Sequence, residues 1–318
     1  MAGPTGARYP SSGTIQYAPQ LFSSKVMRIF TESTLCNEIA NTDYEGEVKG
    51  KGDQVKVRVA PTYMTVEDYV PGTPINYETP GEDSRLLDID QAKVLGFKVD
   101  DVDDMQSDLT LMNIFAERAG NSAKINTDSN VLNYAKNKAF GGPKPGGNAA
   151  SSGNKGATAG IVSASYDLGV AAAAIVITKD NATDKIVDVG TVLSEYNVPE
   201  ENRYMVIPNW YANFLKKSDL KAANLTGDSK AVLRTGLIGE VDNFMIYKSN
   251  LVATTVDTGL KYHCIAGIKD AITFASQINK TESVRSQDNF EDLWRLLLLY
   301  GREVIMPEAL AELYCAPA

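Results

Sequence analysis

Length, composition and charge limit what this chain can be. Its 318 residues, 43% of them hydrophobic, can bury a core without support from disulfides or metals. A formal net charge of −9 disfavours a dedicated nucleic-acid binder, because phosphate backbones repel an acidic surface. The three cysteines are too few and too scattered for a disulfide framework or a zinc knuckle, which favours a reducing compartment.

The N-terminal region predicts an arm with no core of its own. Residues 1–20 are rich in Gly, Pro and Ser and lack the apolar stretch of a signal peptide. The longest apolar run, 168–177, is too short to span a membrane, so a soluble cytoplasmic protein is expected. Within 21–41 an apolar stripe recurs at helical spacing and predicts a short amphipathic helix that must be buried against something else. The stripe consists of Phe22, Val26, Ile29 and Phe30.

A two-stranded ribbon is expected next. Valines alternate with charged residues over 51–61, and the start of the stretch 88–104, with Leu87 before it, alternates in the same way and is the expected partner. Lys56 and Arg58 would then face aspartates, at about 0.2–1 kcal/mol for each opposite-charge pair. The connecting segment 62–84 is too long for a hairpin turn. A floppy insertion is one interpretation; we favour an extended ribbon that finds its missing core on a partner chain.

The stretch 88–104 reads as a strand that ends in acids. Its apolar residues alternate, with a slip at Gly96: Ile89, Ala92, Val94, Phe97 and Val99. Asp100, Asp101, Asp103 and Asp104 follow. A calcium loop would need a central glycine and a terminal glutamate, which this run lacks, and no partner for a catalytic pair lies nearby. We interpret Asp100, Asp101 and Asp103 as caps that stabilise the start of a long helix by about 0.5–2 kcal/mol.

The helical pattern runs from Met105 to Ala139. Unbroken, it would measure about 36 residues and about 54 Å. Gly120 and the polar run 126–130 are poor helix formers, so the sequence predicts either a bend or a second helix that starts at Val131. The glycine-rich segment 141–160 is expected to be a flexible linker or loop.

The remainder alternates helix and strand. Helical or apolar segments are expected at 166–180 and 187–196, and a helix after Pro208. Strands are expected at 202–208, 244–247 and 262–276, and the closing segment 280–314 is first extended and then strongly apolar.

Motifs of enzymes are missing from the sequence. The sole histidine, His263, precedes Cys264, but neighbours on a strand point to opposite faces, so the imidazole cannot activate that thiol. No G-x-S-x-G elbow, P-loop or dinucleotide fingerprint occurs. These observations favour a structural protein over an enzyme.

Several stretches, in this order, resemble the major capsid proteins of tailed bacteriophages with the Hong Kong 97-type fold. They are "NTDYEGEVKGKGDQVKVRV", "VEDYVPGTPINYE", "LLDIDQAKVLGFKVDDVDDMQS", "NVPEENRYMVIPNWYANFLKK", "GLIGEVDNFMIYKSNLV" and the region from "CIAGIKDAITFAS" to "MPEALA". The resemblance covers roughly residues 20 to 313 and implies an α+β fold. It implies an N-terminal arm (1–43), an extended β-ribbon loop (44–100), a peripheral domain with a long spine helix (101–159 and 276–306) and an axial domain (160–275 and 307–318).

What the resemblance implies for function is a non-enzymatic shell protein. It would self-assemble as pentamers and hexamers into an icosahedral head around double-stranded DNA, within the virion, after assembly in the host cytoplasm. Its partners would be its own copies, a separate scaffolding protein and a portal, with room for a decoration protein; DNA would be contacted weakly, and no cofactor, metal or membrane is expected. No lysine lies between Lys56 and Lys93, so the loop crosslinks of some relatives are not expected. The alternatives are an encapsulin-type nanocompartment shell and a metal-dependent enzyme that uses the aspartate cluster.

Charge placement suggests where copies meet. Glu67, Asp68 and Tyr69 lie near the tip of the extended loop, and Arg285 lies near its expected landing area. We expect these residues to form contacts between subunits.

Overall fold

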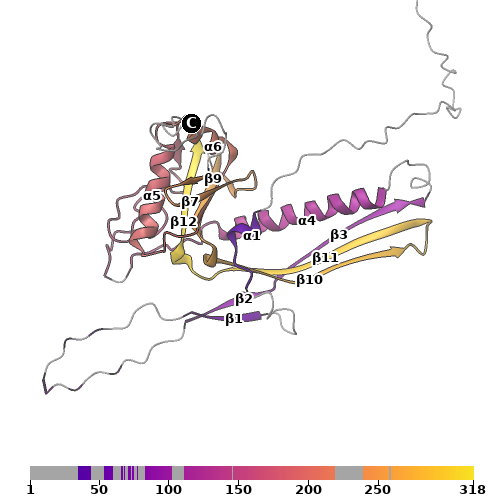
Figure 1. Cartoon of the computed structure of the whole chain (residues 1–318), viewed down its shortest axis with the longest axis horizontal. Coiled ribbons are helices and arrows are strands. Elements are labelled where there is room, and N and C mark those ends of the chain that lie inside the picture. The colour runs from indigo at the N-terminus through magenta and orange to yellow at the C-terminus, as the bar shows by residue number, and fades with distance from the viewer. Residues whose placement is uncertain are drawn as a thin grey trace, which may run out of the picture.

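The computed structural model describes residues 35–43, 54–59, 83–101, 111–144, 146–218, 239–257 and 259–318, together with positions 66, 68, 71–72, 74 and 77. These residues form a compact part built on a seven-stranded sheet, an elongated part built on a three-stranded sheet, and a two-stranded ribbon. Figure 1 shows the compact part at one end, with the helix α4 and the long strands extending away from it.

The seven-stranded sheet holds the main core. Its order is β4-β12-β9-β5-β7-β6, with β8 on β9. The bounds are β4 Ile175–Ile177, β5 Arg203–Ile207, β6 Glu240–Val241, β7 Phe244–Lys248, β8 Thr254–Val256, β9 Leu260–Ile268 and β12 Leu310–Pro317. Every residue of β5 is buried, as its continuous apolar run predicts.

Two helices pack with this sheet. In α5 (Ala182–Glu195), Ile186, Val189 and Leu193 recur at helical spacing and are fully buried, and the helix contacts β12. The second helix, α6 (Asn209–Lys217), begins directly after Pro208, whose fixed φ suits the start of a helix. The Tyr211 hydroxyl of α6 donates a hydrogen bond of 2.9 Å to the Ala182 carbonyl of α5, which joins the two helices.

The elongated part is an antiparallel sheet with one long helix along it. Its order is β10-β11-β3, with β3 Gln91–Asp100, β10 Ile272–Arg285 and β11 Glu291–Val304. The chain passes between the two sheets three times: once between β3 and β4, and twice through the short 3-10 helices η2 (Lys269–Ala271) and η3 (Pro307–Ala309). The helix α4 (Leu111–Ala135) runs beside β3 and β11 (Figure 1). One face of the sheet therefore lies against a helix.

The ribbon pairs β1 (Gln54–Val59) antiparallel with β2 (Asp83–Asp88), which confirms the strand predicted within 51–61. Its register opposes Lys56 to Leu86 and Arg58 to Ser84. The prediction that Lys56 and Arg58 lie opposite aspartates is therefore wrong, because the strand paired with β1 is Asp83–Asp88 and not the start of the stretch 88–104. A small apolar cluster joins the ribbon to the long sheet: Leu87, Ile89 and Ala275, with Val55 and Leu299 at its edge.

Two predictions about regular elements are wrong. β3 has no slip at Gly96: its pairing with β11 is continuous, so Ala92 and Val94 lie on the exposed face. The helix α4 runs unbroken through Gly120 and 126–130. Tertiary packing outweighs weak propensity there, since Val131 and Leu132, directly after the polar run, are almost fully buried.

Two further predictions hold only in part. The segment 141–160 is a loop, as predicted, but it is packed and not a flexible linker: the Asn154 side chain is fully buried and donates hydrogen bonds of 2.6 and 3.2 Å to the carbonyls of Glu308 and Leu310. Of the two alternatives for 166–180, the helix is wrong, because Gly169 has a φ of +86° and lies so close to β12 that a Cβ would meet the Tyr314 carbonyl oxygen at 2.3 Å.

Other predictions lie outside the described residues, namely the amphipathic stripe within 21–34 and the helix start at 102–110. Directly after that stripe, the short helix α1 (Cys36–Ile39) lies near α4. Among the described residues no helix is long and apolar enough to cross a membrane.

Candidate assembly interfaces

A cluster of charges closes the far end of the long sheet. Arg285, at the end of β10, donates hydrogen bonds from Nη1 to Asp101 Oδ1 (2.6 Å) and Asp292 Oδ1 (3.1 Å), and its Nη2 also contacts Asp101. The guanidinium lowers the pKa of the Asp101 carboxyl, and the two carboxylates raise the pKa of Arg285. Arg285 is thus engaged within its own chain, although its side chain remains 49% exposed.

The neighbouring acids extend this cluster. Asp100 is the last residue of β3 and lies opposite Glu291, and the Asp101 amide donates to the Phe290 carbonyl at 3.1 Å. Glu291 pairs with Lys98 Nζ at 2.9 Å, which lowers the pKa of Glu291 and raises that of Lys98. The capping roles of Asp100, Asp101 and Asp103 remain predictions, because the backbone of 102–110 lies outside the described residues.

The face of the long sheet that is turned away from α4 exposes apolar side chains. Val94 on β3 is 74% exposed and Val284 on β10 is 45% exposed, with Leu297 of β11 beside Val94 in the register. Charged residues lie among them: Glu282 pairs with Lys280 and with Arg295, and both cations lower its pKa. An apolar face bordered by charges is typical of a surface that another protein covers.

The turn between β10 and β11 and the segment between β1 and β2 also expose apolar side chains. Phe290, at the turn between β10 and β11, is 80% exposed. Val66 and Tyr77, in the segment between β1 and β2, are also exposed, as is Asp68. Glu67 and Tyr69, which the sequence singles out beside Asp68, lie outside the described residues. Large exposed apolar side chains therefore occur on the elements that project from the compact part, as they do on the compact part itself, where Val256 is 84% exposed.

A buried polar network ties the end of α4 to the seven-stranded sheet. Glu312 of β12 contacts His263 Nδ1 of β9 and accepts a hydrogen bond of 2.8 Å from the Asn137 amide, just after α4. His263 Nε2 lies 2.8 Å from the Thr255 hydroxyl of β8, which also accepts from Lys136 Nζ at 3.3 Å. His263 thus joins strands β8, β9 and β12 through its two ring nitrogens.

A second set of contacts fixes the same helix end to β11. The Tyr134 hydroxyl donates to Glu303 Oε2 at 2.6 Å, and burial together with that carboxylate raises the pKa of Tyr134. The Arg302 guanidinium lies 4.7 Å from the Tyr134 ring centroid, within the range of a cation–π contact. The C-terminal half of α4 is therefore held firmly, whereas Phe115 near its other end is exposed.

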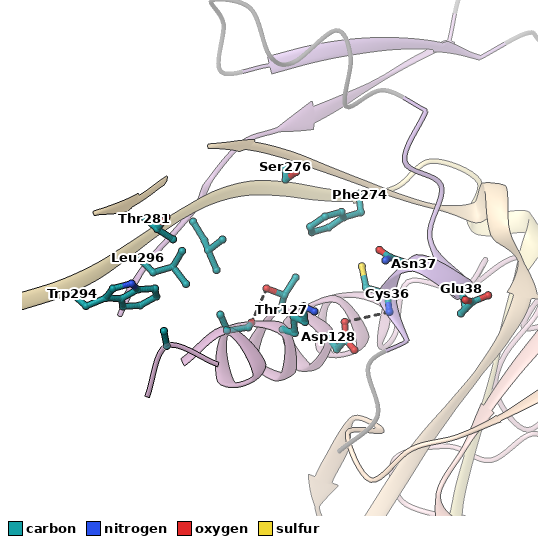
Figure 2. Close-up of a pocket in the computed structure, with 15 residues that line it drawn as sticks. Cys36, Asn37, Glu38, Thr127, Asp128, Phe274, Ser276, Thr281, Trp294 and Leu296 are labelled. Atoms are coloured by element: carbon teal, nitrogen blue, oxygen red, sulfur yellow. Dashed lines mark hydrogen bonds between the residues drawn. The ribbon is translucent and has the colours of Figure 1, made fainter. Parts of the chain in front are cut away.

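A hollow of about 640 Å³ separates α4 from the long sheet. Figure 2 shows Trp294 and Leu296 of β11 on one side, Thr127 and Asp128 of α4 on the other, and Cys36 of α1 at one end. Asp128 is buried and accepts hydrogen bonds from the Leu35 and Cys36 amides at 2.5 and 3.2 Å. Burial raises the pKa of Asp128, and the two amides oppose that rise.

Comparisons with known proteins decide the family. The profile of the family described as "Phage capsid protein" matches residues 86–313, most of the chain. The chain belongs to the phage capsid protein family. No curated protein sequence matches this capsid protein.

Solved structures show the same architecture for this capsid protein. A chain from Mycobacterium phage Che8 is 26% identical and superposes with a TM-score of 0.74, over 93% of this chain and 97% of that one. The capsid structure of the cyanophage P-SCSP1u gives 18% identity, a TM-score of 0.66 and coverages of 95% and 94%. The capsid of Myoviridae phage XM1 is 16% identical and superposes with a TM-score of 0.61, over 96% of this chain and 100% of that one. The Hong Kong 97-type α+β fold that the resemblance implied is therefore confirmed.

The capsid protein is accordingly a structural component of a phage virion and not an enzyme. Neither the nanocompartment nor the metal-dependent enzyme is favoured by these matches. No group of three metal-ligating side chains occurs in the part of the chain that the structure describes.

Sequence reasoning missed two features of the surface and core. The exposed Phe290 stands in the polar turn "SQDNF", where an isolated aromatic between two long strands was the available signal. The acceptor for His263 is Glu312, a charged residue within the apolar run "LAELYCAP". A single carboxylate in a buried strand indicates a buried partner, and the sole histidine was the natural candidate.

Proposed function

We propose that this capsid protein assembles as pentamers and hexamers into the icosahedral head of a tailed phage, around packaged double-stranded DNA. The observation that supports this proposal is the exposure of apolar side chains on the long sheet and its projecting turn, at Val94, Val284 and Phe290. A chain with one well-filled core at one end and exposed apolar surface along its extensions gains stability when other copies cover that surface.

In this proposal the chain divides into an N-terminal arm (1–43), an extended loop (44–100), a peripheral domain (101–159 and 276–306) and an axial domain (160–275 and 307–318). The two short 3-10 helices lie close to the proposed boundaries at 275/276 and 306/307, where the chain passes between the sheets. The Asn154 side chain donates to the Leu310 carbonyl at the start of β12, which supports a place for this loop at the junction of the two proposed domains.

We propose further that Glu67, Asp68 and Tyr69 of one copy contact Arg285 of a neighbour. The described residues give Arg285 three hydrogen bonds, to Asp101 and Asp292, and a guanidinium carries five N–H donors. A further carboxylate can therefore join without breaking the existing pairs.

The remaining partners follow from the same proposal. A separate scaffolding protein would direct assembly, a portal would occupy one vertex, and a decoration protein could cover the outer surface. The net charge of −9 supports weak, non-specific contact with the packaged DNA, because it limits binding to phosphates.

The test combines microscopy with charge reversal. Purified protein is examined by negative-stain electron microscopy as the wild type, as the double variant Glu67→Lys/Asp68→Lys, and as Asp180→Lys, whose carboxylate is exposed on the compact part. We expect closed shells from the wild type and Asp180→Lys, and soluble subunits from the double variant. Normal shells from the double variant would refute the proposed contacts, and wild-type subunits that never form shells, with scaffolding protein present, would refute the assembly itself.

A further inference from the structure

The turn between β10 and β11 presents one large apolar side chain to solvent. Phe290 is 80% exposed, at the end of the long strands that lies farthest from the compact part (Figure 1). An aromatic ring in that position gains free energy when another molecule removes it from water. Phe290 is therefore a candidate anchor for a contact between molecules.

The backbone of this turn is fixed by hydrogen bonds. The Ser286 amide donates to the Glu291 carbonyl and the Glu291 amide donates to the Asn289 carbonyl, each at 3.0 Å. The Phe290 carbonyl itself accepts from the Asp101 amide at 3.1 Å. A side chain on a fixed turn loses little backbone freedom when it binds, so Phe290 is organised in advance for insertion into a partner.

A groove that suits a single side chain lies between β3 and α4. It measures about 270 Å³, is partly open to solvent, and lies at the rim of the long sheet, because β3 is an edge strand. One turn of helix, about 10 Å across and about 5.4 Å high, already exceeds this volume. The groove therefore accepts a side chain and not a further helix. Its lining is mixed, with apolar Leu95, Leu296 and Leu298 and polar Lys93, Ser122 and Asn126.

The turn and the groove carry opposite charges. Lys93 lines the groove, and Asp288 is exposed two positions before Phe290, within about 7 Å along the chain. Neither Lys93 nor Asp288 has an ion-pair partner among the residues that the structure describes. A ring placed against the leucines of the groove would therefore bring the Asp288 carboxylate toward the Lys93 ammonium group.

The turn cannot reach the groove of its own chain. Phe290 is fixed beside Asp101, directly after the end of β3, whereas Lys93 lies seven positions before Asp100 on that strand. Seven residues of strand span about 23 Å, which is much longer than a phenylalanine side chain. A second copy is consequently the source of any Phe290 that fills this groove.

We propose that Phe290 of one copy inserts into the groove between β3 and α4 of a second copy, with Asp288 beside Lys93. This contact rests on the assembly proposed above and specifies one of its interfaces. The turn and the groove are different surfaces of the same chain, so the contact is heterologous: each copy inserts its turn into one neighbour and receives the turn of another. Contacts of this kind can link every subunit of a shell.

Site-specific photocrosslinking tests the contact in the full-length protein. The photoreactive amino acid p-benzoylphenylalanine replaces Phe290, and isotope-labelled and unlabelled subunits are mixed, assembled and irradiated. Mass spectrometry then identifies the linked peptides. We expect the main links to join position 290 to residues 93–95, 122–126 or 296–298, in peptides that combine the two isotope labels and so come from two copies. The same amino acid at Gln287, in the same turn, is the matched control and should give at least about fivefold fewer links to the groove.

The outcomes separate this contact from the assembly as a whole. Shells in which position 290 links mainly to residues outside the groove, or only within one copy, would overturn the contact and leave the assembly intact. Subunits that form no shells with scaffolding protein present would overturn the assembly. The absence of links between copies in that sample would count against the contact as well.

Charge exchange gives a second measurement. Asp288→Lys should raise the lowest protein concentration at which shells form by about tenfold, because it sets two cations against each other. Phe290→Ala should raise it at least as much, since the anchor is lost. The double variant Asp288→Lys/Lys93→Asp restores opposite charges and should return to within about twofold of the wild type. A double variant that assembles no better than Asp288→Lys alone would contradict the proposed pairing.

Discussion

Replacement of His263 by leucine should destabilise the subunit strongly. His263 and Glu312 are each only 5% exposed, and the leucine variant would leave the Glu312 carboxylate in the core with the Asn137 amide as its one remaining partner among the described residues. The removal of one partner of a buried hydrogen bond costs about 1–3 kcal/mol, and more when the group left behind is a carboxylate, because that group loses its partner without regaining water. We expect a loss of that size in the free energy of unfolding.

The double variant His263→Leu/Glu312→Leu separates this cause from simple loss of packing. It removes the carboxylate together with its partner and leaves the Asn137 amide without its acceptor, at about 1–3 kcal/mol. The double variant should therefore be more stable than His263→Leu alone. With Glu312→Leu measured as well, the loss in the double variant minus the sum of the two single losses gives the coupling energy of the pair.

The assay is urea unfolding of unassembled subunits, followed by tryptophan fluorescence. Trp210 reports on this core, because its ring centroid lies 5.3 Å from that of Tyr262, the neighbour of His263 on β9. Met245→Ala, at an exposed position of the same sheet, is the control and should lose less than about 1 kcal/mol. A loss below about 1 kcal/mol for His263→Leu, or a double variant less stable than the single one, would refute the reasoning.

Three further predictions concern the ribbon, the packed loop and the charge cluster. Leu87→Ala should cost about 2–5 kcal/mol, since this side chain is fully buried, and limited proteolysis should then cut the ribbon first. Asn154→Ala should lower thermal stability by about 1–3 kcal/mol, because two carbonyls lose a buried donor; an unchanged melting temperature would contradict this. The pKa of Asp101 is lowered in the folded protein by its pairing with Arg285. This pairing therefore stabilises the fold above the usual carboxyl pKa, and the stabilisation is lost as the pH falls through the lowered value. In Arg285→Gln, the free energy of unfolding in urea should consequently depend less on acid pH.

Elements whose apolar pattern fits one buried face could be predicted from the sequence. The strand β5 and the helix α5 are such cases, since a continuous apolar run predicts a strand covered on both faces and a 3.6-residue spacing predicts a helix on a core. The core of the seven-stranded sheet dictates both patterns, so local and tertiary preferences agree there.

β3 shows why other elements could not be predicted fully. Its face toward α4 carries Gln91 and Lys93, whereas Val94 on the opposite face is exposed, so neither face is consistently apolar. The alternation alone cannot say which face is covered when the partner on one side is another molecule. The predicted slip at Gly96 would have placed Ala92, Val94, Phe97 and Val99 on one face, whereas in β3 the first two lie on one face and the last two on the other.

The charged contacts depended on pairing between distant parts of the chain. Asp101 and Arg285 are 184 positions apart, and His263 and Glu312 are 49 apart. The acidic run was recognisable as the end of a strand, but its cationic partner followed only from the antiparallel register of β10 with β11. Position in the fold, and not spacing in the sequence, brought these groups together.

The unequal anchoring of α4 has a mechanical consequence. Its C-terminal end is fixed through Tyr134 and Asn137, whereas toward the other end Phe115 makes an edge-to-face contact with Phe97 of β3, at 5.8 Å between ring centroids. The 25 residues of α4 span about 37 Å, so a tilt of about 5° at the fixed end would move Leu111 by about 3 Å. Small rotations near Tyr134 would therefore be felt most at the contact between Phe115 and Phe97.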